Sequence, residues 1–336
     1  MVRHRTPEVI DRSSVTLTDQ ERAEVHAVAA ELRRHPAAGQ VDDPRWLAQA
    51  RLHSCRLPVR LLEALRDFRS EPGPGGTLLV GNLPIDAETL PDTPSVPDSV
   101  ERGVTVPAAT AMLLGQQLGD VFAFRDEKRG ALVHNVVPVP ALAASQSNGG
   151  SVRLDLHNEN AFHPHRPDLI GLLCLRSDHE GTAGTLFSSI RRARVLLDDT
   201  DLAILRQPRF VTEAPPSFHA GDATTTHRVL NGSFDDPDIQ VDFNATRAVD
   251  DEAGTALRRL GDALAEVASE LVLRPGDMAF LDNRLVVHGR TRFTPRYDGN
   301  DRWLHRVYVQ LNGRPSLSHR IGPGPVLAQG PCRPRP

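Results

Sequence analysis

From about residue 120 onward, the chain consists of short apolar segments separated by Gly, Pro, Asn and Asp, and this pattern limits the possible folds more than any other feature. Such segments, bounded by regular turn signals, are typical of antiparallel strands rather than of helices. They comprise residues 131–133, 152–156, 170–175, 185–187, 239–243, 278–281 and 303–311. We therefore predict an antiparallel sandwich or jelly roll for this part of the chain.

Helical patterns flank and interrupt the predicted strands. The sequence Thr18-Asp-Gln-Glu21 resembles a capping box, and apolar residues follow it at helical spacing. Residues 58–68 and 109–118 show two further helical patterns, and the segment 252–271 carries leucines on one face of a helical insertion. The expected fold class is therefore mainly β with flanking helices.

The chain has 336 residues, but we find no internal repeat and no convincing linker in it. We therefore expect one domain, 1–336, although this length is above the usual size of a domain. Its parts are an N-terminal helical part (1–72), a β core (75–312) that contains the insertion, and an irregular tail (313–336) rich in Pro, Gly and Arg.

Composition excludes several classes of protein. A net charge of −4 and a pI near 6.4 give no basic surface for nucleic acid, and the apolar run 169–175 is too short to cross a membrane. The N-terminus lacks the apolar segment of a secretory signal, and the three cysteines, Cys55, Cys174 and Cys332, are too scattered for a disulfide framework. We expect a cytoplasmic protein in which any metal is held by histidine and carboxylate.

One short motif has the spacing of a metal site. His157-Asn158-Glu159 is the only His-x-Glu or His-x-Asp in the sequence. On a strand, Asp155, His157 and Glu159 share one side, so two ligands converge and a third must come from elsewhere. A face of two histidines and one carboxylate suits non-haem Fe(II). With fourteen histidines in the chain, about one such match is expected by chance, so the motif alone is weak.

A second segment supplies the missing pieces. His288 follows a β-rich stretch and precedes a glycine, although it fits equally well as a hydrogen-bonded residue at the end of a strand. Beyond it, the stretch 301–310 alternates so that Arg302 and Arg306 share a face. Arginines on a strand face are normally solvated, but two of them after a metal ligand are also suited to bind two carboxylates.

Together these motifs resemble the clavaminate synthase-like branch of the 2-oxoglutarate-dependent oxygenases, particularly the hydroxylases of free arginine, asparagine and citrulline. The similarity covers about residues 75–312 and is strongest at 157–168 and 172–176, where the acid of the motif is Glu, as in that branch. The resemblance implies a double-stranded β-helix (jelly-roll) core, one Fe(II) ion, and 2-oxoglutarate and O2 as co-substrates. It also implies a role in natural-product biosynthesis, such as that of antibiotics.

Carried over residue by residue, the resemblance implies that His157, Glu159 and His288 hold the iron. Arg302, fourteen residues after the last of them, would pair with the C5 carboxylate of 2-oxoglutarate. The hydroxyl of Thr185 would support the same carboxylate. Without the resemblance, Thr185 reads equally well as an ordinary strand residue.

The resemblance also places residues around an amino acid substrate. Arg306 would bind its α-carboxylate and Glu127 its α-ammonium group, although a loop acid such as Glu127 is by default a solvated surface charge. Ser147 and Asn148, which lie shortly before the His-x-Glu motif, would contact the substrate as well.

The distal end of the substrate would meet Gln240 and Asp242, which share a strand face in the segment 239–243. One amide plus one acid suits a ureido or carboxamide group at least as well as a guanidinium. We therefore expect hydroxylation at C3 or C4 of a free amino acid with a nitrogen-rich side chain, with citrulline or an arginine-like residue favoured and asparagine next. A solvated strand face is the competing interpretation.

Three alternatives remain at this point. A site of two histidines and one glutamate also suits a zinc-dependent hydrolase, which would leave Arg302 without a purpose. A non-catalytic jelly-roll binding protein would use the same histidines structurally. A desaturase or cyclase of the same oxygenase family would use the same residues and cofactors.

Overall fold

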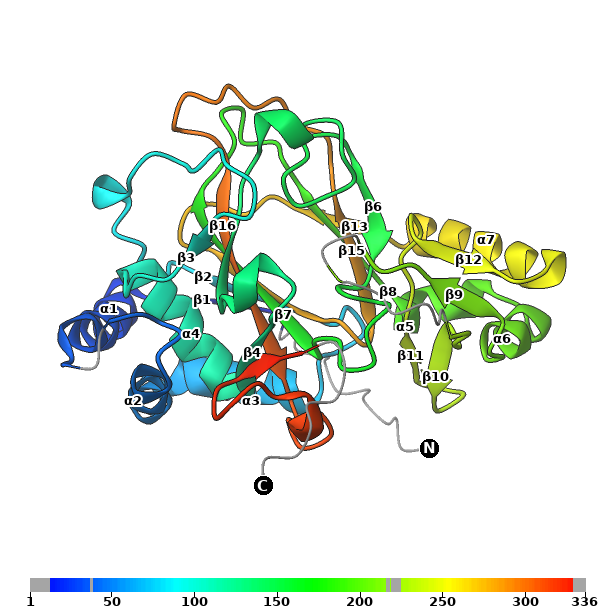
Figure 1. Ribbon diagram of the computed structural model, residues 1–336, viewed down its shortest axis with the longest axis horizontal. Helices are drawn as coiled ribbons and strands as arrows, with labels where there is room; N and C mark the ends of the chain where they lie inside the picture. Colours follow the sequence, from blue (N-terminus) through cyan, green and yellow to red (C-terminus); the bar gives the residue numbers. More distant parts are fainter. Residues whose placement is uncertain (1–12, 37–38, 216–217, 219–224, 329–336) are drawn as a thin grey trace, which may run out of the picture.

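The structure is a computed structural model that describes residues 13–36, 39–215, 218 and 225–328. It is a mixed α/β fold with several sheets (Figure 1). The larger sheet contains nine strands: β1 (Ser14–Thr16), β2 (Thr77–Gly81), β14 (Met278–Asp282), β7 (Leu169–Arg176), β16 (Trp303–Gln310), β4 (Asp120–Phe124) and β17 (Val326–Leu327) in this order, with β5 (Val133–Val136) against β16 and β3 (Val100–Glu101) against β5. Its pairs are antiparallel except β1 with β2 and β17 with β4.

A second sheet has four antiparallel strands: β13 (Ser269–Leu271), β8 (Thr185–Ser189), β15 (Val286–Arg290) and β6 (Leu154–His157). Two small antiparallel pairs complete the described strands: β10 (Leu230–Gly232) with β11 (Pro237–Ile239), and β9 (Phe210–Thr212) with β12 (Thr246–Ala248). The predicted antiparallel pairing is therefore present, in more than one sheet.

The helices gather at the two ends of the molecule (Figure 1). At one end lie α1 (Asp19–Arg34), α2 (Pro44–Ser54), α3 (Val59–Ser70) and α4 (Val106–Leu118), and at the other α5 (Ile190–Ala193), α6 (Asp199–Leu205) and α7 (Asp251–Glu266). Short 3₁₀ turns occur at Ala87–Thr89, Lys128–Gly130, Pro140–Leu142, Arg194–Leu196 and Leu317–His319. No helix in the described ranges is long and apolar enough to cross a membrane.

The N-terminal helices pack on the larger sheet through α4. This helix is apolar on nearly all sides because it lies between α1, α2 and α3 and the strand β16. The capping box before α1 is confirmed: the Glu21 N–H donates to the Thr18 hydroxyl at 3.2 Å, and the Thr18 N–H donates to the Glu21 carboxylate at 2.8 Å. Within the part predicted to be helical, no separate pattern was noted for α2, whose start is marked by Asp43, which accepts the Arg45 N–H at 2.8 Å.

Three boundaries differ from the sequence prediction. The insertion expected at 252–271 is helical only to Glu266, and its last residues form β13, which pairs with β8. The strand expected at 239–243 ends at Ile239, because the Asp242 carboxylate accepts the N–H groups of Asn244 and Ala245 and turns the chain. The tail expected to be irregular from 313 contributes β17, whereas Cys332 lies outside the described residues.

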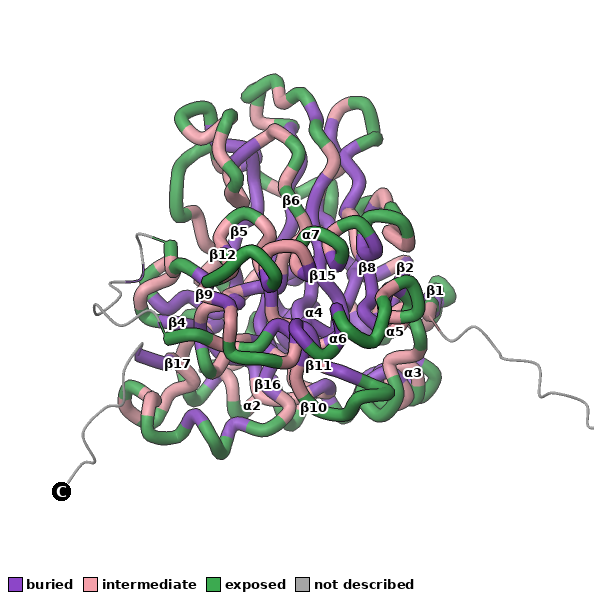
Figure 2. The backbone as a smooth tube through the Cα atoms, turned by 90° about the vertical axis from the view of Figure 1, so that its right-hand side faces the viewer, coloured by how far each residue is buried: buried purple, intermediate pink, exposed green. Residues whose placement is uncertain are grey.

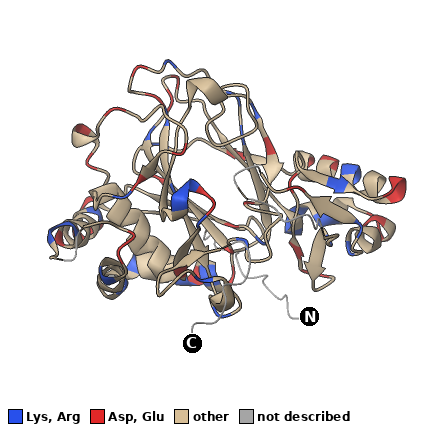
Figure 3. Ribbon diagram, viewed as in Figure 1, with Lys and Arg blue, Asp and Glu red and all other residues tan. Residues whose placement is uncertain are grey.

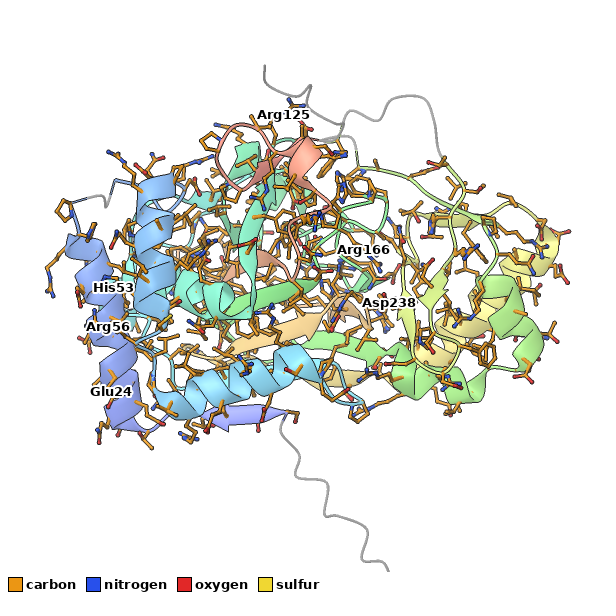
Figure 4. The ribbon with its side chains drawn as sticks, turned by 90° about the horizontal axis from the view of Figure 1, so that it is seen from below. Glu24, His53, Arg56, Arg125, Arg166 and Asp238 are labelled. Carbon is orange, nitrogen blue, oxygen red and sulfur yellow. The ribbon has the colours of Figure 1, made fainter. Side chains whose placement is uncertain are left out.

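The buried residues follow the strands and α4 through the middle of the molecule, with exposed residues on the surrounding loops (Figure 2). Acidic and basic side chains alternate along the outer helices, in keeping with the modest net charge (Figure 3). Arg166 ties the loop after β6 to β11 by donating to the Ile239 carbonyl at 2.7 Å. Burial lowers the pKa of Arg166 to about 10, although Asp238 beside it acts in the opposite direction (Figure 4).

One buried histidine of the core predicts a pH effect on stability. His305 of β16 is 0% exposed, and both of its ring nitrogens lack hydrogen-bond partners within the described residues. Burial lowers its pKa to about 3. As the pH falls below about 6.5, His305 is protonated in the unfolded chain but stays neutral in the folded protein. The free energy of unfolding that depends on His305 is therefore fully present above about pH 6.5 and decreases below it.

We expect the variant His305→Leu to lose less stability in acid than the wild type, by about 2 kcal/mol on going from pH 7.5 to pH 5.0. Urea unfolding of both proteins at the two pH values measures this difference. Other groups, such as His163, also titrate, but they are common to both proteins and cancel in the comparison. Parallel loss of stability in the two proteins would contradict the prediction.

Candidate metal centre

Two neighbouring strands bring the predicted metal ligands together. β6 and β15 run antiparallel, and His157 and His288 are direct partners in their register (Figure 1). The centres of their rings are 4.4 Å apart. Glu159 lies two residues after His157, and one donor atom from each of the three residues lies within 4.8 Å of the others. The predicted ligands therefore converge as the alternation along the strand requires.

The donor atoms fit a divalent metal ion. The His157 Nδ1–H donates to the Asp155 carbonyl at 2.9 Å, which leaves Nε2 as an electron-pair donor. Glu159 Oε2 is buried with no hydrogen-bond partner in the described part of the chain, and it lies 3.6 Å from His288 Nε2. A buried carboxylate oxygen without a partner is costly, and a cation bound between these atoms would satisfy it.

The charges around Glu159 keep it ionised and ready to bind a metal. Burial raises the pKa of Glu159, but the positive charge of Arg306 and the two histidines outweigh burial and hold that pKa below its usual value. Burial and the neighbouring His157 lower the pKa of His288, which favours the neutral, metal-binding form. Glu159 is therefore held in its ionised form and His288 in its neutral form, which are the forms that bind a metal.

Two buried asparagines support the motif, and the sequence reading missed both. Asn158, between the two ligands, donates to the carbonyls of Asn283 and Val286 at 2.8 and 3.0 Å and accepts the Val241 N–H. Asn283 accepts the Glu159 N–H at 2.8 Å and donates to the Glu159 carbonyl. The alternation offered a signal for Asn158, because a residue between two site-facing ligands points into the protein.

Arg306 connects the metal ligand to the rest of the site. Its Nη1 donates to Glu159 Oε1 at 2.8 Å, and its Nη2 donates to Glu127 and to His134 Nδ1. The Tyr308 hydroxyl donates to the same Glu127 oxygen at 2.9 Å. The Arg306 side chain is 2% exposed, so this cation is held between two carboxylates inside the protein.

Asn148 and Ser147 lie on the loop before β6. With its amide oriented for hydrogen bonding, Asn148 accepts from Arg306 Nη1 and Nη2 at 2.8 and 3.3 Å. The Ser147 hydroxyl is 2.6 Å from the hydroxyl of Ser145. Arg306 thus contacts both Glu127 and Asn148, although the three residues are far apart in the sequence.

A cavity of about 790 Å³ opens beside the ligands. Residues from six separate segments line it, including Glu127, Ser147, Asn148, His157, Glu159 and Asp242. Arg306 contacts three of these lining residues without being one of them. The cavity therefore has carboxylates and amides at its wall and a buried guanidinium behind them, a combination that suits a small zwitterion.

Asp242 and Gln240 do not act together as the sequence suggested. Asp242 lines the cavity and pairs with His157 through an isolated antiparallel β-bridge of the backbone. Its Oδ1 accepts backbone N–H groups of the turn that follows. The Gln240 amide instead donates to the Ala161 carbonyl at 2.7 Å, and Gln240 is not among the cavity-lining residues of the described chain. Only the carboxylate of the predicted pair reaches the cavity.

Thr185 and Arg302 lie at the ends of their strands, away from this cavity. Thr185 is the first residue of β8, Arg302 immediately precedes β16, and both are buried. In the described residues, the Arg302 guanidinium has no hydrogen-bond or ion-pair partner, and burial lowers its pKa. A buried guanidinium without a partner is expected where an anion binds.

Comparison with known proteins agrees with the geometry. The family model described as "Taurine catabolism dioxygenase TauD, TfdA family" matches residues 102–308. The L-asparagine oxygenase of Streptomyces coelicolor is 43% identical over 321 residues, which cover 95% of this chain and 96% of the relative. Clavaminate synthase 2 of Streptomyces clavuligerus is 34% identical over 93% of this chain and 97% of its own length.

Two solved structures give the same picture. Asparagine oxygenase in complex with Fe(II), 2S,3S-3-hydroxyasparagine and succinate matches with a TM-score of 0.91 and 43% identity, over 95% of this chain and all of that one. The non-haem iron oxygenase OrfP in complex with Fe and alpha-ketoglutaric acid matches with a TM-score of 0.85 and 30% identity, over 94% of this chain and 99% of the other. The resemblance inferred from the sequence motifs is confirmed: this chain belongs to the TauD/TfdA dioxygenase family, in its clavaminate synthase-like branch of free amino acid hydroxylases.

Proposed function

We propose that this protein hydroxylates C3 of a free L-amino acid that carries a side-chain carboxamide, with L-asparagine as the preferred substrate. The reaction uses Fe(II), 2-oxoglutarate and O2, the cofactors of its family. The observation that carries the proposal is the convergence of His157, Glu159 and His288 beside a cavity lined by carboxylates and amides. The zinc hydrolase and the non-catalytic binding protein are set aside because of the family membership.

The residues present fit the iron ion, with His157 Nε2, His288 Nε2 and Glu159 Oε2 as its ligands. When bound, the iron supplies the activation of O2 that couples decarboxylation of 2-oxoglutarate to oxidation of a substrate C–H bond. The protein holds the reacting carbon near the metal and keeps water from it. For this purpose Arg302 and Thr185 hold the far carboxylate of 2-oxoglutarate, as the resemblance implies.

The substrate's amino acid end is assigned to the Arg306 network. Arg306 receives the α-carboxylate, and Glu127 with Asn148 receives the α-ammonium group, while Ser147 contributes a hydroxyl to the same wall. Support comes from the contacts of Arg306, which place its guanidinium directly behind a carboxylate and an amide of the cavity wall. An α-amino acid carries the complementary pair of charges on adjacent groups.

The preference for asparagine over citrulline rests on Asp242. Its Oδ1 is occupied by backbone N–H groups, so Oδ2 is left to accept one N–H of a distal group. The citrulline preference depended on a second contact from Gln240, whose amide is engaged with Ala161. A single acceptor suits the short carboxamide, and a relative 43% identical to this chain is described as an L-asparagine oxygenase.

Exchanging the acceptor at this position should change the selectivity. In Asp242→Asn, the side-chain oxygen still accepts the backbone N–H groups that form the turn. An NH2 group replaces Oδ2, the oxygen proposed to accept the substrate amide N–H. We expect kcat/KM for asparagine to fall by about ten- to a hundredfold relative to that for aspartate, since mismatched buried polar groups cost about 1–3 kcal/mol. Competition assays with asparagine, aspartate and citrulline measure the ratio.

Gln240→Asp serves as the matched control for this prediction. Because the Gln240 side chain does not line the cavity, the ratio of the three substrates should stay at the wild-type value. If Gln240→Asp shifts the ratio and Asp242→Asn does not, the assignment of the two residues is reversed.

The proposed function is tested by anaerobic reconstitution with Fe(II) and 2-oxoglutarate, followed by O2 and a panel of free amino acids. Mass spectrometry should find asparagine with one added oxygen atom, together with an equal amount of succinate. Loss of two hydrogens instead of gain of oxygen would indicate a desaturase, and absence of coupled succinate with every amino acid would contradict the function.

The same proposal covers the organisation of the chain. We take residues 1–336 as one oxygenase domain in which the two larger sheets form a double-stranded β-helix, with 1–72 and the insertion as additions to the core at 75–312. Antiparallel pairing within both sheets supports this reading. We place the protein in the cytoplasm, where reducing conditions keep iron in the Fe(II) state and thiols such as Cys55 free.

A further inference from the structure

Arg290 is a buried cation near the metal ligands, but it belongs neither to the ligand set nor to the lining of the cavity. It lies on β15, two residues after His288 and therefore on the same side of the strand. The residue is 4% exposed, and its Nη2 donates to the Val152 carbonyl at 3.2 Å. Its guanidinium lies over the ring of Phe293, 5.3 Å from the centre, while its Nε is buried without a hydrogen-bond partner in the described residues.

Strand register places Arg290 beside the predicted 2-oxoglutarate residues. Arg290 and Thr185 are direct partners across the antiparallel pair of β15 and β8, so their side chains share a face. Arg302 is near enough for its positive charge to act on Arg290. Three polar side chains from three strand ends therefore face one region.

No carboxylate of the described residues forms an ion pair with the arginines of this region, Arg290 and Arg302. Asp178 acts on Arg302 from a distance, but its two carboxylate oxygens accept the backbone N–H groups of Thr182 and Ala183. Two buried like charges repel each other and each costs several kcal/mol to desolvate, so an anion from outside the chain is required to balance them.

We infer that Arg290 is a second binding residue for the C5 carboxylate of 2-oxoglutarate, so that two guanidiniums and the Thr185 hydroxyl enclose this carboxylate. The inference rests on the proposed function, because it assumes that 2-oxoglutarate is the anion. A carboxylate has about four acceptor positions, enough for both guanidiniums. The Val152 contact orients Arg290, and its free Nε is available to the ligand.

The competing explanation is a structural role, in which Arg290 only joins β15 to Val152. The variant Arg290→Gln distinguishes this structural role from 2-oxoglutarate binding, because glutamine removes the charge and keeps an N–H donor for the Val152 carbonyl. Arg290→Lys keeps the charge and loses the planar fork. Arg292→Met is the matched control, since it removes one positive charge from an exposed side chain two residues further along the same segment.

The readout is the dissociation constant of 2-oxoglutarate, measured by calorimetry on Mn(II)-loaded protein without O2, with the KM of the amino acid measured separately. We expect Arg290→Gln to weaken 2-oxoglutarate binding by about ten- to a hundredfold with little change in the amino acid KM. Arg290→Lys should lose less affinity than Arg290→Gln, and Arg292→Met should bind as the wild type does.

Wild-type affinity in folded Arg290→Gln would overturn the inference, and so would equal large losses in the Gln and Lys variants. Combining Arg290→Gln with Arg302→Gln adds a second measurement. Two residues on one carboxylate should give losses that do not add, whereas additive losses would mean separate sites. If the wild type itself fails to bind 2-oxoglutarate, the proposed function fails, independently of Arg290.

Discussion

Replacing His288 by alanine should abolish turnover and sharply weaken metal binding. The site provides three protein ligands, so none is spare, and the loss of one leaves Glu159 and His157 without the geometry that holds the ion. Activity should fall to the background of the assay, and the iron content after anaerobic reconstitution and desalting should fall well below one ion per chain. The same result is expected for His157→Ala and Glu159→Ala.

His305→Leu is the control for these ligand variants. It removes a buried strand histidine from the same fold, but this histidine packs against Trp303 in the core and not in the cavity. Iron content and turnover should remain at the wild-type level. Near wild-type activity in any of the three ligand variants, without added imidazole or carboxylate, would show that the iron assignment is wrong.

Replacing Arg306 by methionine should damage both stability and substrate binding. The change leaves Glu159 and Glu127 buried without their shared cation, and breaking a buried pair from one side typically costs about 3–5 kcal/mol. Guanidinium chloride unfolding of the metal-free protein measures this loss. Where the variant folds, the KM of the amino acid should rise on the order of a hundredfold.

The double variant Arg306→Met/Glu127→Gln distinguishes the origin of the instability. Neutralising Glu127 removes one of the two unpaired carboxylates, so part of the lost free energy of unfolding should return, whereas the amino acid KM should not recover. If the double variant is less stable than Arg306→Met alone, the charge imbalance is not the cause of the loss.

The sequence predicted the larger elements because their signals are local. The capping box at Thr18 and the alternation in 303–310 correspond to α1 and β16. The approach of His157 and His288 followed from two strand segments together with the resemblance, and the structure places them opposite each other. The roles assigned to the individual site residues remain predictions until variants are measured.

The features that the sequence did not reveal depend on side chains folding back onto the backbone or on distant partners. Alternation in 239–243 predicts a strand, but the Asp242 carboxylate accepts the N–H groups of Asn244 and Ala245 and turns the chain. The Gln240 amide instead donates to the Ala161 carbonyl, and of the two residues only Asp242 lines the cavity. Asn283 and Arg290 belong to no motif that the sequence shows. Arg290 has Thr185 as its partner through the register of β15 with β8, and Asn283 accepts the Glu159 N–H from the loop after β6.

The hydrogen bond between Arg306 and Glu159 connects the residue proposed to bind the amino acid to a predicted metal ligand. A carboxylate that binds Arg306 draws on the same positive charge that keeps Glu159 ionised, so each ligand alters the free energy of binding of the other. Such linkage is reciprocal: the factor by which the amino acid changes the affinity for iron equals the factor by which iron changes the affinity for the amino acid. With Arg306 in its proposed role, binding of the substrate would alter the affinity of the metal centre for iron through a single guanidinium, with no movement of the backbone required.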